Sequence, residues 1–200
     1  MRIAPDRVAE IVFYAVIACW FGFAAVFLMR KRPPMKEETK RNRVAGAGIF
    51  LQFMAYFAVW FWSRQRASFR PIVSMPQAVE IALGMFTVAV GAGSVWLVLA
   101  AVRTLGKQWA IAARLVEGHK LITEGPYAWV RNPIYTGMFG MLLATGLAVS
   151  RWIVLPAAIA LFGMGTVIRV HSEEKLLREA FGQEFDDYTK RVPAVLPGVY

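Results

Sequence analysis

The chain has 200 residues, of which 58% are hydrophobic and 14% aromatic, and it carries a formal net charge of +10. A soluble domain is at most about half apolar, so this composition favours an integral membrane protein, and the length allows one domain. The lone Cys19 excludes an intrachain disulfide, a zinc cluster of cysteines and a CxxC redox pair.

Five apolar segments are long enough to predict membrane-spanning helices, because a helix needs about 20 residues to cross the hydrocarbon. In chain order they are residues 8–29, 44–62, 78–102, 134–150 and 153–168. The first is too long for a signal peptide, and a basic run from Arg30 follows it instead of a small-residue cleavage site. The last two are short and joined by only Arg151 and Trp152, which predicts a tight helical hairpin.

The segment after the fifth span has its own helical pattern. Apolar residues recur at helical spacing between charges, at Leu176, Leu177, Ala180, Phe181 and Phe185. This predicts that the fifth helix continues into an amphipathic helix, which Gly182 ends or bends and which prolines 193 and 197 follow. The expected fold class is therefore an all-α integral membrane protein, with residues 1–200 forming a single membrane-embedded domain.

The basic residues are distributed unevenly between the two sides of the predicted bundle. Seventeen of the 23 Lys and Arg residues fall on one side, within 30–43, within 103–133 and after residue 168. The positive-inside rule then predicts that the amino terminus lies outside and the carboxyl terminus in the cytoplasm. Because these charges flank the spans, we interpret them as topology signals and contacts with membrane lipids, and we expect no nucleic-acid partner.

A polar, turn-rich stretch at residues 121–137 precedes the fourth span. Pro133 is 18 residues before Arg151, and Arg169 is 18 residues after it. Two antiparallel helices of equal length would therefore bring this stretch and the start of the tail to one cytoplasmic level. Ionisable groups at that depth are costly unless they are paired or used. The residues expected to gather there are Arg131, Asn132, Tyr135, Arg169, His171, Glu173 and Glu174.

The same residues can also be interpreted as purely structural. Arg169 and Glu173 have the spacing of an i,i+4 ion pair on one helix face. Tyr127, Trp129 and Tyr135 fit an interfacial aromatic belt. The phosphate loop and the HExxH zinc motif are both absent, and we predict no metal site.

The motifs of this region resemble the isoprenylcysteine carboxyl methyltransferase family, which adjoins the phospholipid methyltransferases. The resemblance covers residues 119–197. It is carried by His119-x-Leu121-Ile122-Thr123-x-Gly125-Pro126-Tyr127, by Val130-Arg131-x-Pro133-x-Tyr135-x-Gly137, by Arg169-x-x-x-Glu173-Glu174-x-x-Leu177, by Phe181-Gly182-x-Glu184-Phe185-x-x-Tyr188 and by Arg191-Val192-Pro193-x-x-Leu196-Pro197.

This resemblance implies S-adenosyl-L-methionine as the cofactor, in a pocket built from residues 106–137 and 169–197. Glu173 would hold the amino-acid or ribose end of the cofactor, and Arg169 would bind the substrate carboxylate, which makes these two the expected catalytic residues. Asn132 departs from the family pattern, which has histidine there. The expected cofactor-binding residues besides Glu173 are His119, Lys120, Leu121, Ile122, Tyr127, Asn132, Pro133, Ile134 and Tyr135.

Three functions remain open at this point. The first is carboxyl O-methylation of an isoprenylcysteine-like or other lipophilic carboxylate, whether a small molecule or a lipidated protein. It needs no general base, only a cation such as Arg169. The second is N-methylation of a phospholipid amine, which needs a base such as His171 or Glu174. The third is a non-enzymatic membrane scaffold whose tail binds headgroups or a partner.

Small residues in the fourth span have two possible uses. Gly137, Gly140 and Ala144 share one helix face. Small residues permit close packing against another helix, and they can also leave room for an acyl or prenyl chain. We expect packing.

Overall fold

The computed structural model describes residues 5–28, 43–61, 76–106, 120–150 and 153–196. Within these ranges every regular element is a helix, which confirms the predicted all-α class. The helices are α1 (Pro5–Leu28), α2 (Arg43–Phe61), α3 (Gln77–Leu105), the 3₁₀ helix η2 (Gly125–Ala128), α4 (Pro133–Val149), α5 (Val154–Phe181) and α6 (Gln183–Arg191).

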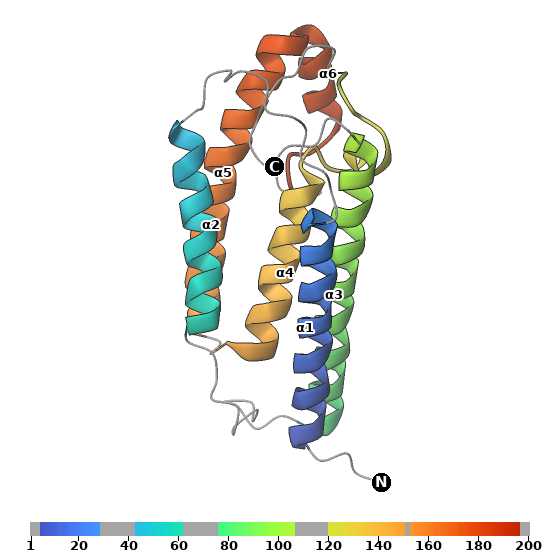
Figure 1. Cartoon of the computed structure of the whole chain (residues 1–200), viewed down its shortest axis with the longest axis vertical. Helices are drawn as coiled ribbons and strands as arrows, with labels where there is room; N and C mark the ends of the chain where they lie inside the picture. Colours follow the sequence, from blue (N-terminus) through green and yellow to red (C-terminus); the bar gives the residue numbers. More distant parts are fainter. Residues whose placement is uncertain (1–4, 29–42, 62–75, 107–119, 151–152, 197–200) are drawn as a thin grey trace.

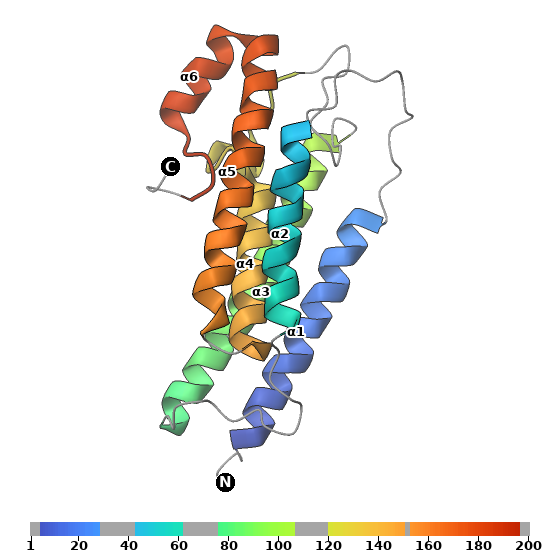
Figure 2. The same cartoon turned by 90° about the vertical axis from the view of Figure 1, so that its left-hand side faces the viewer.

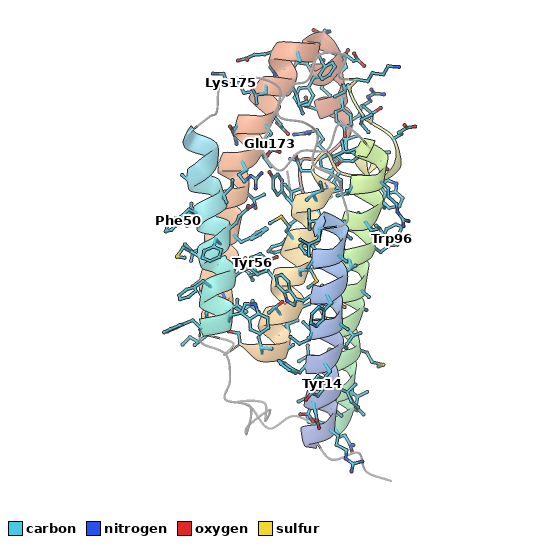
Figure 3. The ribbon with its side chains drawn as sticks, in the orientation of Figure 1. Tyr14, Phe50, Tyr56, Trp96, Glu173 and Lys175 are labelled. Carbon is cyan, nitrogen blue, oxygen red and sulfur yellow. The ribbon has the colours of Figure 1, made fainter. Side chains whose placement is uncertain are left out.

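The five long helices run alternately up and down one elongated bundle (Figure 1). α1, α3 and α5 are long and apolar enough to cross a membrane, and the apolar parts of α2 and α4 are shorter. Large apolar side chains cover the outside of the bundle, as Phe50 on α2 and Trp96 on α3 do (Figure 3). A surface of this kind suits lipid and not water, so the protein is an integral membrane protein.

The largest helix contacts in the bundle lie outside the predicted α4–α5 hairpin. α5 packs chiefly on α2, and α4 packs chiefly on α3, while α4 and α5 touch each other much less. α4 and α5 are antiparallel and joined by a short connection, as predicted for a hairpin, but each of them packs more extensively on another helix. Glycines allow the closest backbone approaches between α2 and α5 and between α3 and α4.

Two of these approaches explain the small-residue face of α4. A Cβ on Gly137 would clash with Val98 of α3, and a Cβ on Gly140 would clash with Ser94. A Cβ on Gly91 of α3 would in turn lie 3.6 Å from the Ala144 Cβ atom. The small residues therefore serve close helix packing, as expected, and not an acyl-chain cavity.

Polar side chains inside the bundle tie its helices together. The Trp20 indole donates to Thr145 Oγ1 at 3.0 Å, which links α1 to α4. The Tyr56 hydroxyl donates to the Met138 carbonyl oxygen at 2.6 Å, so α2 is linked to α4 as well. Figure 3 shows Tyr56 directed from α2 into the bundle. In hydrocarbon such groups must find partners within the protein, and here they do so across helix pairs.

The tail follows the predicted course. α5 continues well beyond the apolar span and ends at Gly182, whose φ of +50° lies in the region that favours glycine. α6 then folds back beside the end of α5 (Figure 2). Its apolar residues Phe185 and Tyr188 are buried, so this amphipathic helix faces the protein interior with its apolar side.

Candidate active site

Residues 120–137 form a turn-rich segment that caps the end of the bundle where α4 begins. Gly125 has φ +60°, and a Cβ there would lie 2.9 Å from Thr104 Oγ1, so glycine is required for both conformation and space. Pro126 and Tyr127 are buried in η2. Pro133 occupies the first turn of α4, where its missing N–H costs nothing. The prolines and glycine thus fix the path of this segment.

A cavity of about 100 Å³ lies between this segment, the end of α3, the upper part of α5 and α6. Its wall combines aliphatic and aromatic side chains with a few charged and hydrogen-bonding ones. The lining residues are Leu105, Lys120, Leu121, Ile122, Tyr127, Arg131, Asn132, Glu174, Leu177, Phe185 and Tyr188.

Arg131 fastens the wall of this cavity. Its Nε donates to Glu174 Oε1 at 2.9 Å, and its Nη2 lies 2.8 Å from the same oxygen. Its Nη1 donates to the Thr189 carbonyl oxygen at 3.1 Å and also to the carbonyl oxygen of Val192. The Arg131 and Glu174 side chains are only 11% and 12% exposed. One guanidinium therefore joins the start of α4 to α5, to α6 and to the tail.

The segment 192–196, here called the C-terminal strap, crosses the start of α4. The Pro193 carbonyl accepts from the Arg131 backbone N–H at 2.8 Å. The Ala194 carbonyl accepts from Asn132 twice, from its backbone N–H at 2.9 Å and from Nδ2 at 3.1 Å. The Val195 carbonyl accepts from Thr136 Oγ1 at 2.6 Å. Asn132 thus lines the cavity and holds the strap.

A second polar cluster joins the first turns of α4 to α5. The Tyr135 hydroxyl donates to Glu173 Oε1 at 2.5 Å, and Arg169 Nη2 donates to the same oxygen at 3.2 Å. The guanidinium carbon of Arg169 lies 4.9 Å from the centre of the Tyr135 ring. The side chains of Arg169 and Glu173 are 12% and 23% exposed. Figure 3 labels Glu173 on the upper half of α5.

Two adjacent acids of α5 therefore belong to different networks. Successive residues on an α-helix point about 100° apart. Glu173 turns toward Tyr135 and Arg169, while Glu174 turns toward Arg131 and the cavity. Each carboxylate has its own arginine, so neither acid leaves an uncompensated charge in this poorly solvated region.

Two tyrosines near the cavity stay protonated at neutral pH. Burial raises the pKa of the Tyr127 phenol well above its usual range, and the charges of Tyr188 and Glu173 raise it further. Burial also raises the pKa of Tyr188 to about 12, although Arg131 opposes the shift. The Tyr188 hydroxyl donates to the Tyr127 carbonyl oxygen at 2.5 Å. Both phenols are therefore neutral near pH 7.

The predicted cofactor-binding residues divide into groups. Five of them line the cavity: Lys120, Leu121, Ile122, Tyr127 and Asn132. His119 lies outside the described residues. Pro133, Ile134, Tyr135 and Glu173 do not line the cavity; Pro133 and Tyr135 are buried in the first turns of α4, and Ile134 packs against the apolar cluster between α1 and α3. Their cofactor-binding role stays a prediction.

Several lining residues had no role assigned from the sequence. Arg131, Leu177, Phe185 and Tyr188 stand within the family motifs, so a motif signal for them existed. The sequence predicts Glu174 as a member of the polar cluster and as a possible base, but not as a cavity-lining residue. Leu105 carries no motif signal, and only the arrangement of α3 beside the cavity reveals it.

Comparison with known proteins identifies the family of this chain. Residues 72–184 match the sequence model of the phospholipid methyltransferase family. The chain belongs to this family. The match includes α3, the turn-rich segment, α4, α5 and the α5–α6 junction, and therefore most of both polar networks.

Individual relatives are similar over part of their length. A nickel-cobalt-cadmium resistance protein from Alcaligenes xylosoxydans xylosoxydans is 38% identical over 98 residues, which are 47% of this chain and 44% of that protein. A protein-S-isoprenylcysteine O-methyltransferase from Tribolium castaneum is 34% identical over 79 residues, which are 40% of this chain and 28% of that enzyme. The chain thus matches less than half the length of each of these curated relatives.

A solved structure supports the fold. The eukaryotic intramembrane Ras methyltransferase, an isoprenylcysteine carboxyl methyltransferase, superposes with a TM-score of 0.64 over 100% of this chain and 70% of that chain, at 20% sequence identity. The resemblance that the motifs indicated is confirmed.

Proposed function

We propose that this protein is an S-adenosyl-L-methionine-dependent membrane methyltransferase that methylates a lipophilic carboxylate. The observation that carries the proposal is the position of the Arg169–Glu173–Tyr135 cluster beside a cavity lined by Lys120–Ile122, Tyr127 and Asn132. The similarity to the protein-S-isoprenylcysteine O-methyltransferase from Tribolium castaneum supports this substrate class.

The chemistry of the cavity wall fits the cofactor. Leu121, Ile122 and Phe185 provide apolar surface for a flat adenine ring, and residues 120–123, which belong to no helix or strand, carry backbone hydrogen-bonding groups. The rings of Tyr127 and Tyr188 provide aromatic faces of the kind that attract a cation. When bound, the cofactor supplies a methyl group on a positively charged sulfur.

Arg169 has the properties required of a carboxylate-binding residue. A guanidinium carries five N–H donors, enough to serve Glu173 and a substrate carboxylate together. The side chain is largely shielded from water, which strengthens such a charge-assisted contact. A carboxylate is already ionised near pH 7, so these residues need only to orient it and exclude water.

The sidedness of the membrane completes the proposal. The cavity lies at the end of the bundle where α3 and α5 end and α4 begins. The predicted positive-inside side is this same end. We therefore place the active site and the carboxyl terminus in the cytoplasm, where the cofactor is made, and the amino terminus outside.

The alternative acceptor is a phospholipid amine, which the description of the matching family favours. An ammonium must lose a proton before it can accept a methyl group. Glu174 is held in the ion pair with Arg131, and His171 is exposed with Nδ1 2.9 Å from the Val167 carbonyl oxygen. Neither is arranged as a base beside Arg169, so the carboxylate acceptor is favoured. The scaffold reading loses support because α6 turns its apolar face inward.

The deciding experiment is methyl transfer by the detergent-purified protein from radiolabelled S-adenosylmethionine. The two acceptors are a farnesylcysteine analogue with a free carboxylate and phosphatidylethanolamine. We expect a labelled product from the prenylcysteine alone, and mild base should release its label because it is an ester. A base-stable product from phosphatidylethanolamine would favour the amine, and no product from either acceptor would contradict both enzymatic functions.

A further inference from the structure

Helix α2 lies directly against the side chain of Arg169. A Cβ built on Gly48 would lie 2.6 Å from Arg169 Cγ and 2.7 Å from the Gly165 carbonyl oxygen. A Cβ built on Gly165 would lie 2.6 Å from the Gly48 carbonyl oxygen. Real Cβ atoms do not make such short contacts, so this approach of α2 to α5 requires glycine at both positions.

A buried hydrogen bond sets the register of this contact. One turn along α2, Gln52 Nε2 donates to Thr166 Oγ1 of α5 at 2.9 Å. Gln52 and Thr166 are 3% and 5% exposed, within apolar surroundings. Because residues four apart share a helix face, Gly48 and Gln52 meet α5 together. A polar pair in the hydrocarbon resists sliding or rotation of one helix against the other, since it has no water to turn to.

The contact acts on the part of Arg169 that determines its direction. Cγ is the second carbon of the side chain, so the Gly48 backbone limits the rotamers available at the first two torsions. The rotamer that remains directs the guanidinium toward the Tyr135 ring, at 4.9 Å, and toward Glu173 Oε1, at 3.2 Å. α2 thus packs against one side of Arg169, the residue that is proposed to bind the acceptor.

We infer that Gly48, held in register by the Gln52–Thr166 hydrogen bond, is a positioning residue that keeps Arg169 oriented for the acceptor carboxylate. The inference rests on the proposed function of Arg169. It assigns to the second helix, outside the matched family region of residues 72–184, a role in the acceptor side of the site.

Three alanine substitutions separate positioning from helix packing. Gly48→Ala would collide with both Arg169 and the α5 backbone. Gly165→Ala would collide with the Gly48 carbonyl and approach Gln52, but no Arg169 atom is among its nearest neighbours. Gly46→Ala meets nothing within 4 Å and is the matched neutral control on α2. A loss of packing alone affects the first two variants alike.

The first measurement requires no substrate. The purified variants are treated with phenylglyoxal, which modifies arginine, and peptide mass spectrometry follows the rate at Arg169. We expect Gly48→Ala to raise this rate severalfold, because the side chain must leave its present position. Gly46→Ala should stay near the wild-type rate, and Gly165→Ala, which displaces α2 but meets no Arg169 atom directly, should raise the rate less than Gly48→Ala does. Equal rates for Gly48→Ala and Gly165→Ala would overturn the inference.

The second measurement is steady-state methyl transfer to the prenylcysteine analogue, with cofactor affinity by calorimetry. We expect Gly48→Ala to lower the acceptor kcat/KM by about tenfold or more, since small misplacements of a binding group have effects of this size. S-adenosylmethionine affinity should change little, because Arg169 does not line the cavity. An acceptor kcat/KM that simply follows Tm across the variants would overturn the inference.

A milder variant covers the case in which Gly48→Ala fails to fold. Gln52→Leu removes the register hydrogen bond without a clash, and we expect it to raise the Arg169 modification rate and lower the acceptor kcat/KM in the same direction, but less. A Gln52→Leu variant with the wild-type Arg169 modification rate and the wild-type acceptor kcat/KM would count against the inference. If the wild type transfers no methyl group while Arg169 reactivity still responds more to Gly48→Ala than to Gly165→Ala, the proposed function fails and the positioning of Arg169 stands.

Discussion

Two arginine–glutamate pairs lie near the start of α4, and they differ in what surrounds them. Arg131 pairs with Glu174 and also donates to two backbone carbonyls of α6 and the strap. Arg169 pairs with Glu173, stacks on Tyr135 and touches a glycine of α2. The first pair joins four segments of the chain. The second faces a helix that itself faces lipid.

This difference in surroundings indicates different roles for Arg131 and Arg169. A guanidinium that holds a carboxylate and two carbonyls uses most of its N–H donors on fixed partners, which suits a structural role. The Arg169 guanidinium is oriented by a carboxylate, an aromatic face and a helix backbone, and guanidinium groups are well suited to bind carboxylates. We therefore expect substitutions of the Arg131 pair to affect stability first, and substitutions of the Arg169 pair to affect turnover first.

The largest expected effect is on folding. Arg131→Ala leaves the nearly buried Glu174 carboxylate and two carbonyls without their donor, and breaking a buried pair in this way costs about 3–5 kcal/mol. Thermal unfolding in detergent should show a large fall in Tm. The double variant Arg131→Met, Glu174→Leu should recover much of it, because the stranded charge is gone.

A matched control for this variant is Arg178→Ala. Arg178 pairs with Asp186 at 2.7 Å, but the two side chains are 51% and 40% exposed. Water and salt screen such a pair, so its Tm should stay close to that of the wild type. Equal losses of Tm for Arg131→Ala and Arg178→Ala would contradict the structural role of the Arg131 network.

The second effect is on turnover. Arg169→Ala should lower the acceptor kcat/KM by about a hundredfold or more, equivalent to about 2.7 kcal/mol of transition-state stabilisation. Arg169→Lys should recover part of this, because it keeps the charge and loses the fork of donors. Affinity for S-adenosylmethionine, measured on the same preparations, should change little. If Arg169→Ala instead loses its affinity for S-adenosylmethionine and keeps the acceptor KM, Arg169 belongs to the cofactor site and not to the acceptor site.

A smaller effect is expected at Asn132, which joins the cavity wall to the strap. Asn132→Ala removes the Nδ2 donor to the Ala194 carbonyl and should cost about 1 kcal/mol of stability. Because the strap closes over the same wall, cofactor affinity should fall severalfold. Asn132→His keeps a donor and should stay nearer the wild type. If Asn132→Ala has wild-type Tm and affinity, the strap does not depend on this contact.

The smallest effect near neutral pH concerns Tyr188. Its phenol has a pKa of about 12 in the folded protein and about 10 when unfolded. The folded state therefore favours the neutral form, so this contribution is complete below pH 10 and is lost as the pH rises toward 12. Tm measured from pH 9 to 12 should fall, and Tyr188→Phe should make that fall shallower. An identical slope in the variant would contradict the buried, donating state of this hydroxyl.

The sequence predicted the elements of this fold better than their pairing. Long apolar runs fix where helices begin and end, and Gly182 marked the α5–α6 break. The runs are apolar on nearly every face, so their pattern does not reveal which helices meet. The α2–α5 contact depends on Gly48, Gly165 and the Gln52–Thr166 bond, which only the structure brings together.

The candidate site, too, could be predicted only in part from the sequence. The motifs identified the segment 120–132 that lines the cavity. They did not reveal which of the adjacent acids turns toward it, because that depends on the rotation of α5 in the bundle. The structure gives the cavity wall to Glu174 and gives Glu173 to Arg169.

The most direct test of the central claim is calorimetric titration of S-adenosylmethionine into the detergent-purified protein. Asn132→Ala and Arg169→Ala are measured beside the wild type. We predict saturable binding by the wild type, weaker binding by Asn132→Ala and nearly unchanged binding by Arg169→Ala, which would put the cofactor on the cavity side and leave Arg169 available for the acceptor. A well-folded wild type that binds no S-adenosylmethionine would contradict the proposed methyltransferase function.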